Sequence, residues 1–63
     1  MNLRDIAIDL MYKYPVSISG DKLIVITTFK WQLENICRDN NLVIESTRTV
    51  DSVLIEGVFI SKG

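Results

Sequence analysis

Two segments of this chain are apolar at successive positions instead of at alternating ones. They are residues 22–27 (KLIVIT) and residues 53–60 (VLIEGVFI). Successive side chains of a β-strand point to opposite faces, so a sheet with one face in water alternates apolar and polar residues. The two segments therefore predict strands with apolar residues on both faces. Two short helices cover only one face, so the second apolar face is predicted to meet another molecule, most simply another copy of the chain.

The spacing of apolar residues elsewhere predicts two helices. Between residues 2 and 14, apolar side chains recur three or four positions apart, which places them along one side of a helix. Asn2 is the expected N-cap, and Pro15 is expected to end the helix because it disfavours helical backbone at the residue before it. The apolar side consists of Leu3, Ile6, Ala7, Leu10 and Tyr14.

The second helix is predicted to begin with a cap at Thr27 or Thr28 and to continue to about Asn40. Asn41 follows, and asparagine tolerates the left-handed backbone that often ends a helix. The apolar side of this helix is predicted to consist of Phe29, Leu33, Ile36 and Cys37.

Turn residues indicate two hairpins. Gly20-Asp21 separates residues 16–19 from residues 22–28, and a two-residue turn of this kind would pair Ser19 with Lys22. The second hairpin is predicted to join residues 42–49 to residues 53–60 across residues 50–52. In the last strand, alternate positions place Leu54, Val58 and Ile60 on one face beside Glu56.

The expected fold is therefore an α+β domain in the order helix, β-hairpin, helix, β-hairpin. Its four strands form one antiparallel sheet with both helices on one face. A winged-helix fold is the main competitor, but it would normally need a third helix before the wing. Residues 1–60 are predicted to form the single domain and residues 61–63 a flexible tail. The sequence leaves the order of the strands open.

Composition narrows the chemistry available to the chain. Its 63 residues include one cysteine and no histidine, which excludes an internal disulfide and a zinc site of the usual Cys/His type. No nucleophile–base pair, phosphate-binding loop or metal-ligand motif is present. We therefore expect no catalytic residues, no cofactor and no metal, and we do not expect an enzyme. A domain this small is marginally stable alone, which favours association.

Charge and hydropathy point to a cytoplasmic protein with no membrane segment. No signal peptide is evident, because Asp5 and Asp9 interrupt the stretch where its apolar region would lie. The apolar runs are far shorter than the roughly 18 residues that span a bilayer. A single thiol is consistent with a reducing compartment.

The sequence thus favours a protein-interaction or regulatory module. Its partner would be another copy of the chain, with a dimer as the first expectation, or a larger protein. The predicted interface is the outer face of the sheet. Trp31 forms a second candidate surface with Asn35 and Arg38, because Trp and Arg are enriched at interface hot spots. A structural alternative is that Trp31 folds over the preceding strand or the end of the first helix. The outer-face residues are Ile24, Ile26, Val43, Leu54, Val58 and Ile60.

A small nucleic-acid-binding regulator is the alternative function. Dimerisation would gather basic residues of two copies into one strip, although the net charge of −1 disfavours this function because phosphate binding usually needs a basic excess. Cys37 is interpreted as a core residue, and Glu45 and Glu56 as solvated or interface-edge carboxylates, not as an acid–base pair. The basic residues of the strip would be Lys22, Lys30, Arg38 and Arg48.

Overall fold

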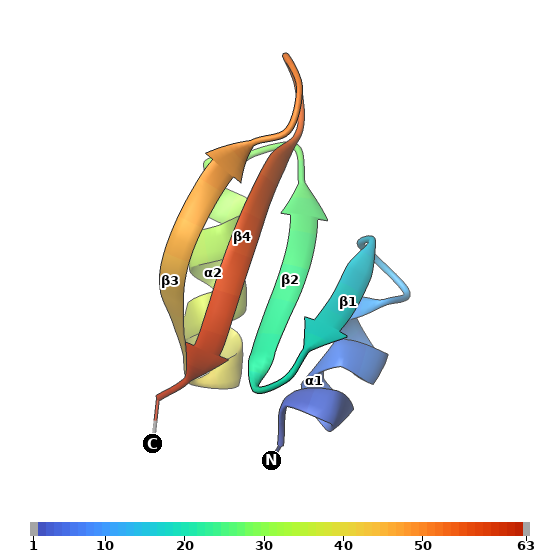
Figure 1. The fold of residues 1–63 in the computed structure, drawn as a ribbon, viewed down its shortest axis with the longest axis vertical. Coiled ribbons are helices and arrows are strands. Elements are labelled where there is room, and N and C mark those ends of the chain that lie inside the picture. The colour runs from blue at the N-terminus through green and yellow to red at the C-terminus, as the bar shows by residue number, and fades with distance from the viewer. Residues whose placement is uncertain (1, 63) are drawn as a thin grey trace.

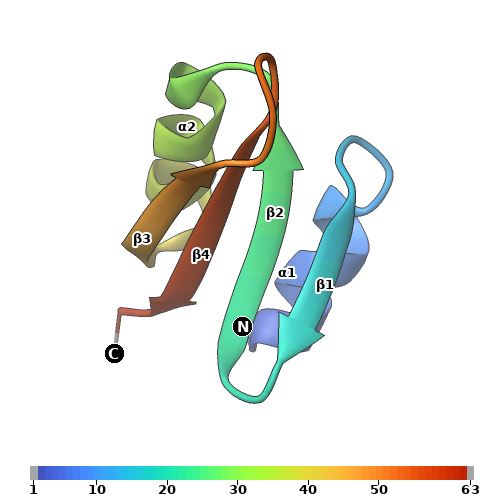
Figure 2. The ribbon, with the colours of Figure 1, turned by 45° about the horizontal axis from the view of Figure 1, so that its top comes forward.

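The computed structural model describes residues 2–62, which form two helices and one four-stranded antiparallel sheet (Figure 1). This arrangement confirms the predicted α+β fold and its order of elements. Both helices lie on the same face of the sheet, α1 behind β1 and α2 behind β3 and β4 (Figures 1 and 2). The elements are α1 (Leu3–Leu10), β1 (Val16–Ser19), β2 (Lys22–Thr27), α2 (Lys30–Asn40), β3 (Leu42–Thr49) and β4 (Ile55–Ser61).

The strand order is β1-β2-β4-β3, so β2 and β4 are the two central strands. These are the strands that carry apolar residues at successive positions. A central strand is flanked by neighbours on both sides, which shield part of its surface on either face of the sheet. The apolar pattern that predicts burial on both faces therefore coincides with the central position in the sheet.

Helix α1 begins as predicted and ends earlier than predicted. The Asn2 side chain accepts a hydrogen bond from the backbone N–H of Asp5 at 2.9 Å, which confirms Asn2 as the N-cap. The helix ends at Leu10 because the following residues form a turn. In that turn the N–H groups of Lys13 and Tyr14 both donate to the carbonyl of Leu10, at 2.9 and 3.0 Å.

Helix α2 begins at Lys30, with Phe29 in the N-cap position, so the prediction of a threonine cap was wrong. The side chain of Gln32 provides the capping interaction instead. Its Oε1 accepts hydrogen bonds from the backbone N–H groups of Thr28 at 3.1 Å and Phe29 at 3.0 Å. At the other end, Asn41 has the predicted left-handed backbone, with φ of 56°.

The first hairpin has the predicted register, in which Ser19 pairs with Lys22 and Val16 with Val25. The second hairpin differs, because its loop extends to Leu54 and β4 begins only at Ile55. Asp51 accounts for the longer loop: its Oδ1 accepts the N–H groups of Val53 at 2.8 Å and Leu54 at 3.0 Å.

Strands β3 and β4 also contain two local features that the sequence pattern did not reveal. Their register shifts between Ile44 and Ser46, where a β-bulge accommodates Glu45 as an extra residue. Ser61, which was predicted to lie in the tail, is the last residue of β4 and pairs with Leu42. Gly63, also assigned to the tail, lies outside the described residues. Neither helix is long and apolar enough to cross a bilayer.

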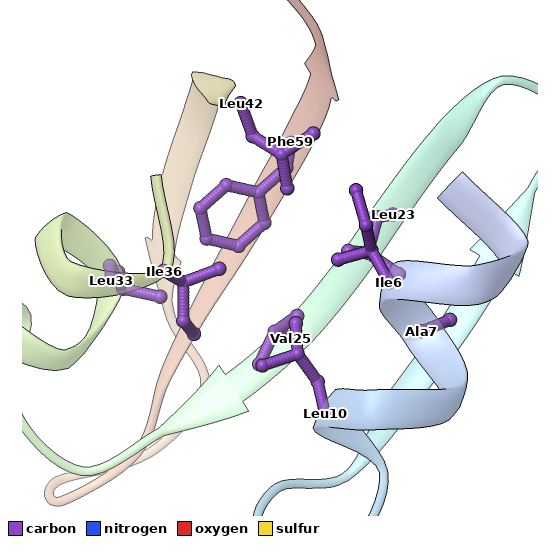
Figure 3. Close-up of a cluster of buried hydrophobic side chains, with 9 residues drawn as sticks. All are labelled: Ile6, Ala7, Leu10, Leu23, Val25, Leu33, Ile36, Leu42 and Phe59. Atoms are coloured by element: carbon purple, nitrogen blue, oxygen red, sulfur yellow. The ribbon is translucent and has the colours of Figure 1, made fainter. Parts of the chain in front are cut away.

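The core lies between the inner face of the sheet and both helices (Figure 3). Phe59 of β4 is at its centre and has no solvent exposure, as is also true of Leu33 from α2. Gly57 allows the helix to approach: an added Cβ there would lie 2.7 Å from Cδ2 of Leu33 and 3.3 Å from Cε2 of Phe59. The core residues are Ile6, Ala7, Leu10, Leu23, Val25, Leu33, Ile36, Leu42 and Phe59.

We expect Gly57→Ala to lower the free energy of unfolding by about 1–3 kcal/mol, because the added methyl group would overlap Cδ2 of Leu33, which is fully buried and must shift within the core. Chemical denaturation followed by circular dichroism measures the loss. Ser19→Ala is the control, since it also places an alanine in a strand, but at an exposed position. This substitution should change the free energy of unfolding by less than about 0.5 kcal/mol. Equal stability of Gly57→Ala and the parent protein would contradict the close packing of α2 against β4.

Candidate protein-interaction surface

An apolar strip runs along the outer face of the sheet, the side opposite the helices. It lies on the two central strands, where Ile24 of β2 pairs with Val58 of β4. Ile26 and Ile60 extend the strip toward its two ends, and all four side chains are partly exposed. Val43 of β3 pairs with Ile60 and adds a side chain that is 41% exposed. Both helices lie on the opposite side of the sheet, so neither covers this strip; the outer face of the sheet faces the viewer in Figure 1.

Two ion pairs lie on the outer face beside the apolar strip. Lys22 Nζ is 2.8 Å from Glu45 Oε1, and this pair joins β2 to β3 across the intervening β4. The bond to Glu45 also raises the pKa of the Lys22 ammonium. Arg48 Nη2 lies 3.3 Å from Glu56 Oε1 on the neighbouring strand. Glu45 and Glu56 therefore each have a cationic partner.

The outer face also contains a shallow hollow of about 300 Å³ near the start of β1. Ile24 and Ile26 form one wall of it, and Glu56 supplies its one ionisable lining group. Pro15, Val16 and Ser17 complete the lining. Side chains of a partner packed on the strip would find a recess at this end.

Leu54 lies outside β4, whereas the prediction placed it within the last strand. It precedes β4, in the loop held by Asp51, and its carbonyl accepts the backbone N–H of Val50 at 2.9 Å. It lines a separate groove of about 380 Å³ between this loop and the residues that precede α2. The prediction assumed that the strand begins at residue 53, whereas the Asp51 side chain holds residues 53 and 54 in the loop and β4 begins at Ile55.

Trp31 lies at the beginning of α2, on the helix side of the molecule. Its ring stacks on that of Phe29, with centroids 6.1 Å apart and planes 12° from parallel. Both side chains remain more than half exposed, at 57% and 54%. The prediction that Phe29 belongs to the buried side of the helix was therefore wrong. A clue was available in Gln32, because a glutamine three residues after a position is a capping signal for that position.

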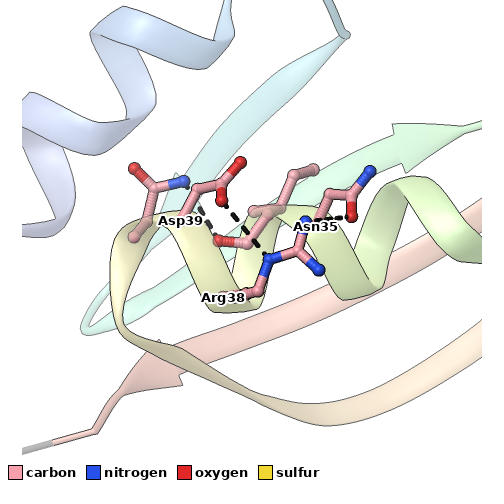
Figure 4. Close-up of polar contacts among 5 residues, drawn as sticks. Asn35, Arg38 and Asp39 are labelled. Carbon is pink, nitrogen blue, oxygen red and sulfur yellow. Dashed lines mark hydrogen bonds and ion pairs between the residues drawn. The ribbon is translucent and has the colours of Figure 1, made fainter.

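Asn35 and Arg38 lie one and two turns after Trp31, and Arg38 is bound to its neighbours (Figure 4). Arg38 Nη2 donates to Asn35 Oδ1 at 2.7 Å, and Arg38 Nε lies 3.6 Å from Asp39 Oδ1. The two predicted candidate surfaces thus lie on opposite sides of the sheet: the apolar strip on the outer face, and an aromatic and polar surface on α2.

The four basic residues proposed to form a nucleic-acid strip do not lie together in one copy of the chain. Lys22 and Arg48 are on the outer face, whereas Lys30 and Arg38 are on α2, on the opposite side of the sheet. Three of the four have carboxylate partners: Lys22 with Glu45, Arg48 with Glu56 and Arg38 with Asp39. Dimerisation would have to rearrange these pairs to expose a basic strip.

Among residues 2–62, no three His, Cys, Asp or Glu side chains are grouped so that they could hold a metal ion. No protein-family model matches the chain, and comparisons with curated proteins and with solved structures also returned no match. A function must therefore be argued from the surfaces described above.

Cys37 packs at the edge of the core and is partly exposed. Burial raises the pKa of its thiol, the charge of Glu34 raises it further, and a hydrogen bond with the Ile44 backbone opposes both. Since the thiolate is the reactive form, we expect slower alkylation by iodoacetamide at pH 8 than for a free cysteine. The rate should rise at higher pH and become normal in guanidinium chloride. Rapid labelling of the folded protein at pH 7 would contradict this environment.

Proposed function

We propose that this protein is a small, non-enzymatic, cytoplasmic interaction module that forms a homo-oligomer through the outer face of its sheet. The observation that carries the proposal is the uncovered apolar strip built from Ile24, Ile26, Val58 and Ile60. A face that only met water would carry polar residues at these alternating positions. Burying the strip against a second copy would remove apolar surface from water in both chains.

A second copy suits this face because the charges beside the strip can be matched by symmetry. In a two-fold interface, each patch meets the identical patch of the partner. Each copy carries two ion pairs beside the strip, Lys22 with Glu45 and Arg48 with Glu56, and each pair consists of one cation and one carboxylate. Cations and carboxylates of two copies can therefore meet without leaving an excess of one sign.

Replacing apolar side chains of the strip by threonine, which has the shape of valine and is smaller than isoleucine, tests the interface. We expect Ile24→Thr and Val58→Thr to weaken self-association about tenfold each, since the loss of buried apolar surface costs roughly 1–2 kcal/mol. Both substitutions retain a β-branched side chain that suits a strand. Light scattering across a roughly hundredfold dilution measures the dissociation constant.

Leu54→Thr is the matched control, because Leu54 is similarly apolar but lies in the loop outside the strip. It should leave the dissociation constant unchanged. Thermal melts of all three variants establish that each remains folded. The proposal fails if the parent protein is monomeric at every concentration, or if Leu54→Thr weakens association as much as Val58→Thr does.

Trp31 reports separately on the surface of α2, because it is the one tryptophan of the chain. Assembly through the outer face leaves its exposed ring in water, so the wavelength of its fluorescence emission should not change on dilution. A shift to shorter wavelength in the assembled protein would show that the interface includes α2. That result would contradict an oligomer built through the outer face alone.

A further inference from the structure

Strand β1 is an edge strand with unpaired backbone groups along its outer side. Its neighbour is β2, and the carbonyl of Pro15, just before β1, accepts the N–H of Ile26 at 3.1 Å. In an antiparallel pair, alternate residues point their N–H and C=O groups toward the partner or away from it. Pro15, Ser17 and Ser19 therefore face β2. Val16 and Ile18 direct two N–H and two C=O groups away from the sheet.

An apolar groove runs beside these groups. It has a volume of about 250 Å³ and lies between α1 and β1. Its floor is formed by Ile8 of α1, which is 48% exposed, and by Met11, which follows the helix and is 61% exposed. Val16 and Ile18 form the wall on the strand side, and Ile18 is 42% exposed. A strand added to this edge would find an apolar surface for every second side chain.

A second copy of this chain does not fit the groove through its own β1. Helix α1 lies behind β1 (Figure 2). Paired strands are about 4.8 Å apart, whereas packed helices need about 8–10 Å between their axes. Antiparallel pairing of two β1 strands about a two-fold axis would force the two α1 helices into the same space. Parallel pairing would turn the second copy over, so that its Ser17 and Ser19, instead of apolar side chains, would face the groove. An extended segment with no helix behind it meets no such obstacle.

The charge in the groove indicates the chemistry of that segment. Arg4 is the one charged residue that lines it, and it forms no ion pair within residues 2–62. It also lines the adjoining hollow beside Gly20 and Asp21, so it stands toward the hairpin end of the groove. A carboxylate on the bound segment would pair with this guanidinium.

We propose that the groove between α1 and β1 binds an extended segment of a partner protein as a fifth strand of the sheet. Such a segment has apolar side chains at alternating positions and an acidic residue that meets Arg4. Backbone hydrogen bonds to Val16 and Ile18 hold it, and the floor formed by Ile8 and Met11 selects its apolar residues. This groove lies on the helix side of β1 and shares Val16 with the outer-face hollow, but the inference does not rest on the proposed oligomer.

The test uses a synthetic peptide of alternating valine and threonine with a glutamate at each end, so that either strand direction offers a carboxylate to Arg4. It is titrated to roughly millimolar concentration into ¹⁵N-labelled protein. We expect the amide resonances of Val16 and Ile18 to shift and their hydrogen exchange to slow. The other edge strand, β3, is the internal control. Unchanged Val16 and Ile18 resonances, or equal shifts on both edges, would overturn the proposal.

Two N-methylated peptides test whether the peptide binds through the backbone hydrogen bonds of an added β-strand. One is methylated at every valine nitrogen and the other at every threonine nitrogen. Only alternate N–H groups of a strand face the same neighbour, so one peptide should lose binding and the other should retain it. Equal binding by both, or loss of binding by both, would contradict strand addition.

Arg4→Gln tests the acidic residue, and Lys13→Gln is the matched control outside the groove lining. We expect Arg4→Gln to weaken binding of the glutamate peptide about threefold and to leave a glutamine version of the peptide unaffected. Lys13→Gln should change neither. Equal binding of the glutamate peptide by Arg4→Gln and the parent would overturn the assignment of the carboxylate. Val58→Thr, the outer-face variant, should bind the peptide normally, which keeps the two proposals distinguishable.

Discussion

The contact of Leu33 with Gly57 is the constraint on which the rest of the structure depends. A glycine at the middle of a central strand lets α2 descend until Leu33 nearly touches the backbone, and Phe59 fills the space beside it. With α2 over one half of the sheet, α1 covers the other half, and one core is shared by all six elements. The contact places α2 on one face of the sheet, and α1 packs on the same face, so no helix within residues 2–62 covers the other.

The regular parts of the fold could be predicted because they depend on periodicity and on short turns. The Gly20-Asp21 turn determines the register of the first hairpin down to Val16 and Val25. Two of the errors occur where a polar side chain accepts hydrogen bonds from the backbone. Gln32 caps α2 and leaves Phe29 outside the helix, and Asp51 holds Leu54 in a loop. Each of these interactions depends on a single side chain that bonds to the backbone, so it produces no periodic pattern in the sequence.

The candidate site could be predicted in part for the same reason. Alternation along β2 and β4 correctly placed Ile24, Ile26, Val58 and Ile60 on one face. The partners of the charged residues could not be predicted, because Lys22 meets Glu45 only once β4 has been inserted between their strands. Strand order is a property of the packed sheet, and either hairpin offers two edges for pairing. The groove at β1 was not predicted, because Ile8 and Met11 lie outside the apolar side assigned to the first helix.

The β-bulge at Glu45 gives the two edges of the sheet different capacities for growth. Strand β3 carries this irregularity together with Glu45 and Arg48, and bulges and charges on an edge discourage further strands from pairing. Strand β1 has neither feature between Val16 and Ser19. A sheet that can pair with an added strand at only one of its two edges cannot extend from molecule to molecule. The chain can thus offer an open edge without seeding fibrils, because polymerisation by this route ends after a single addition.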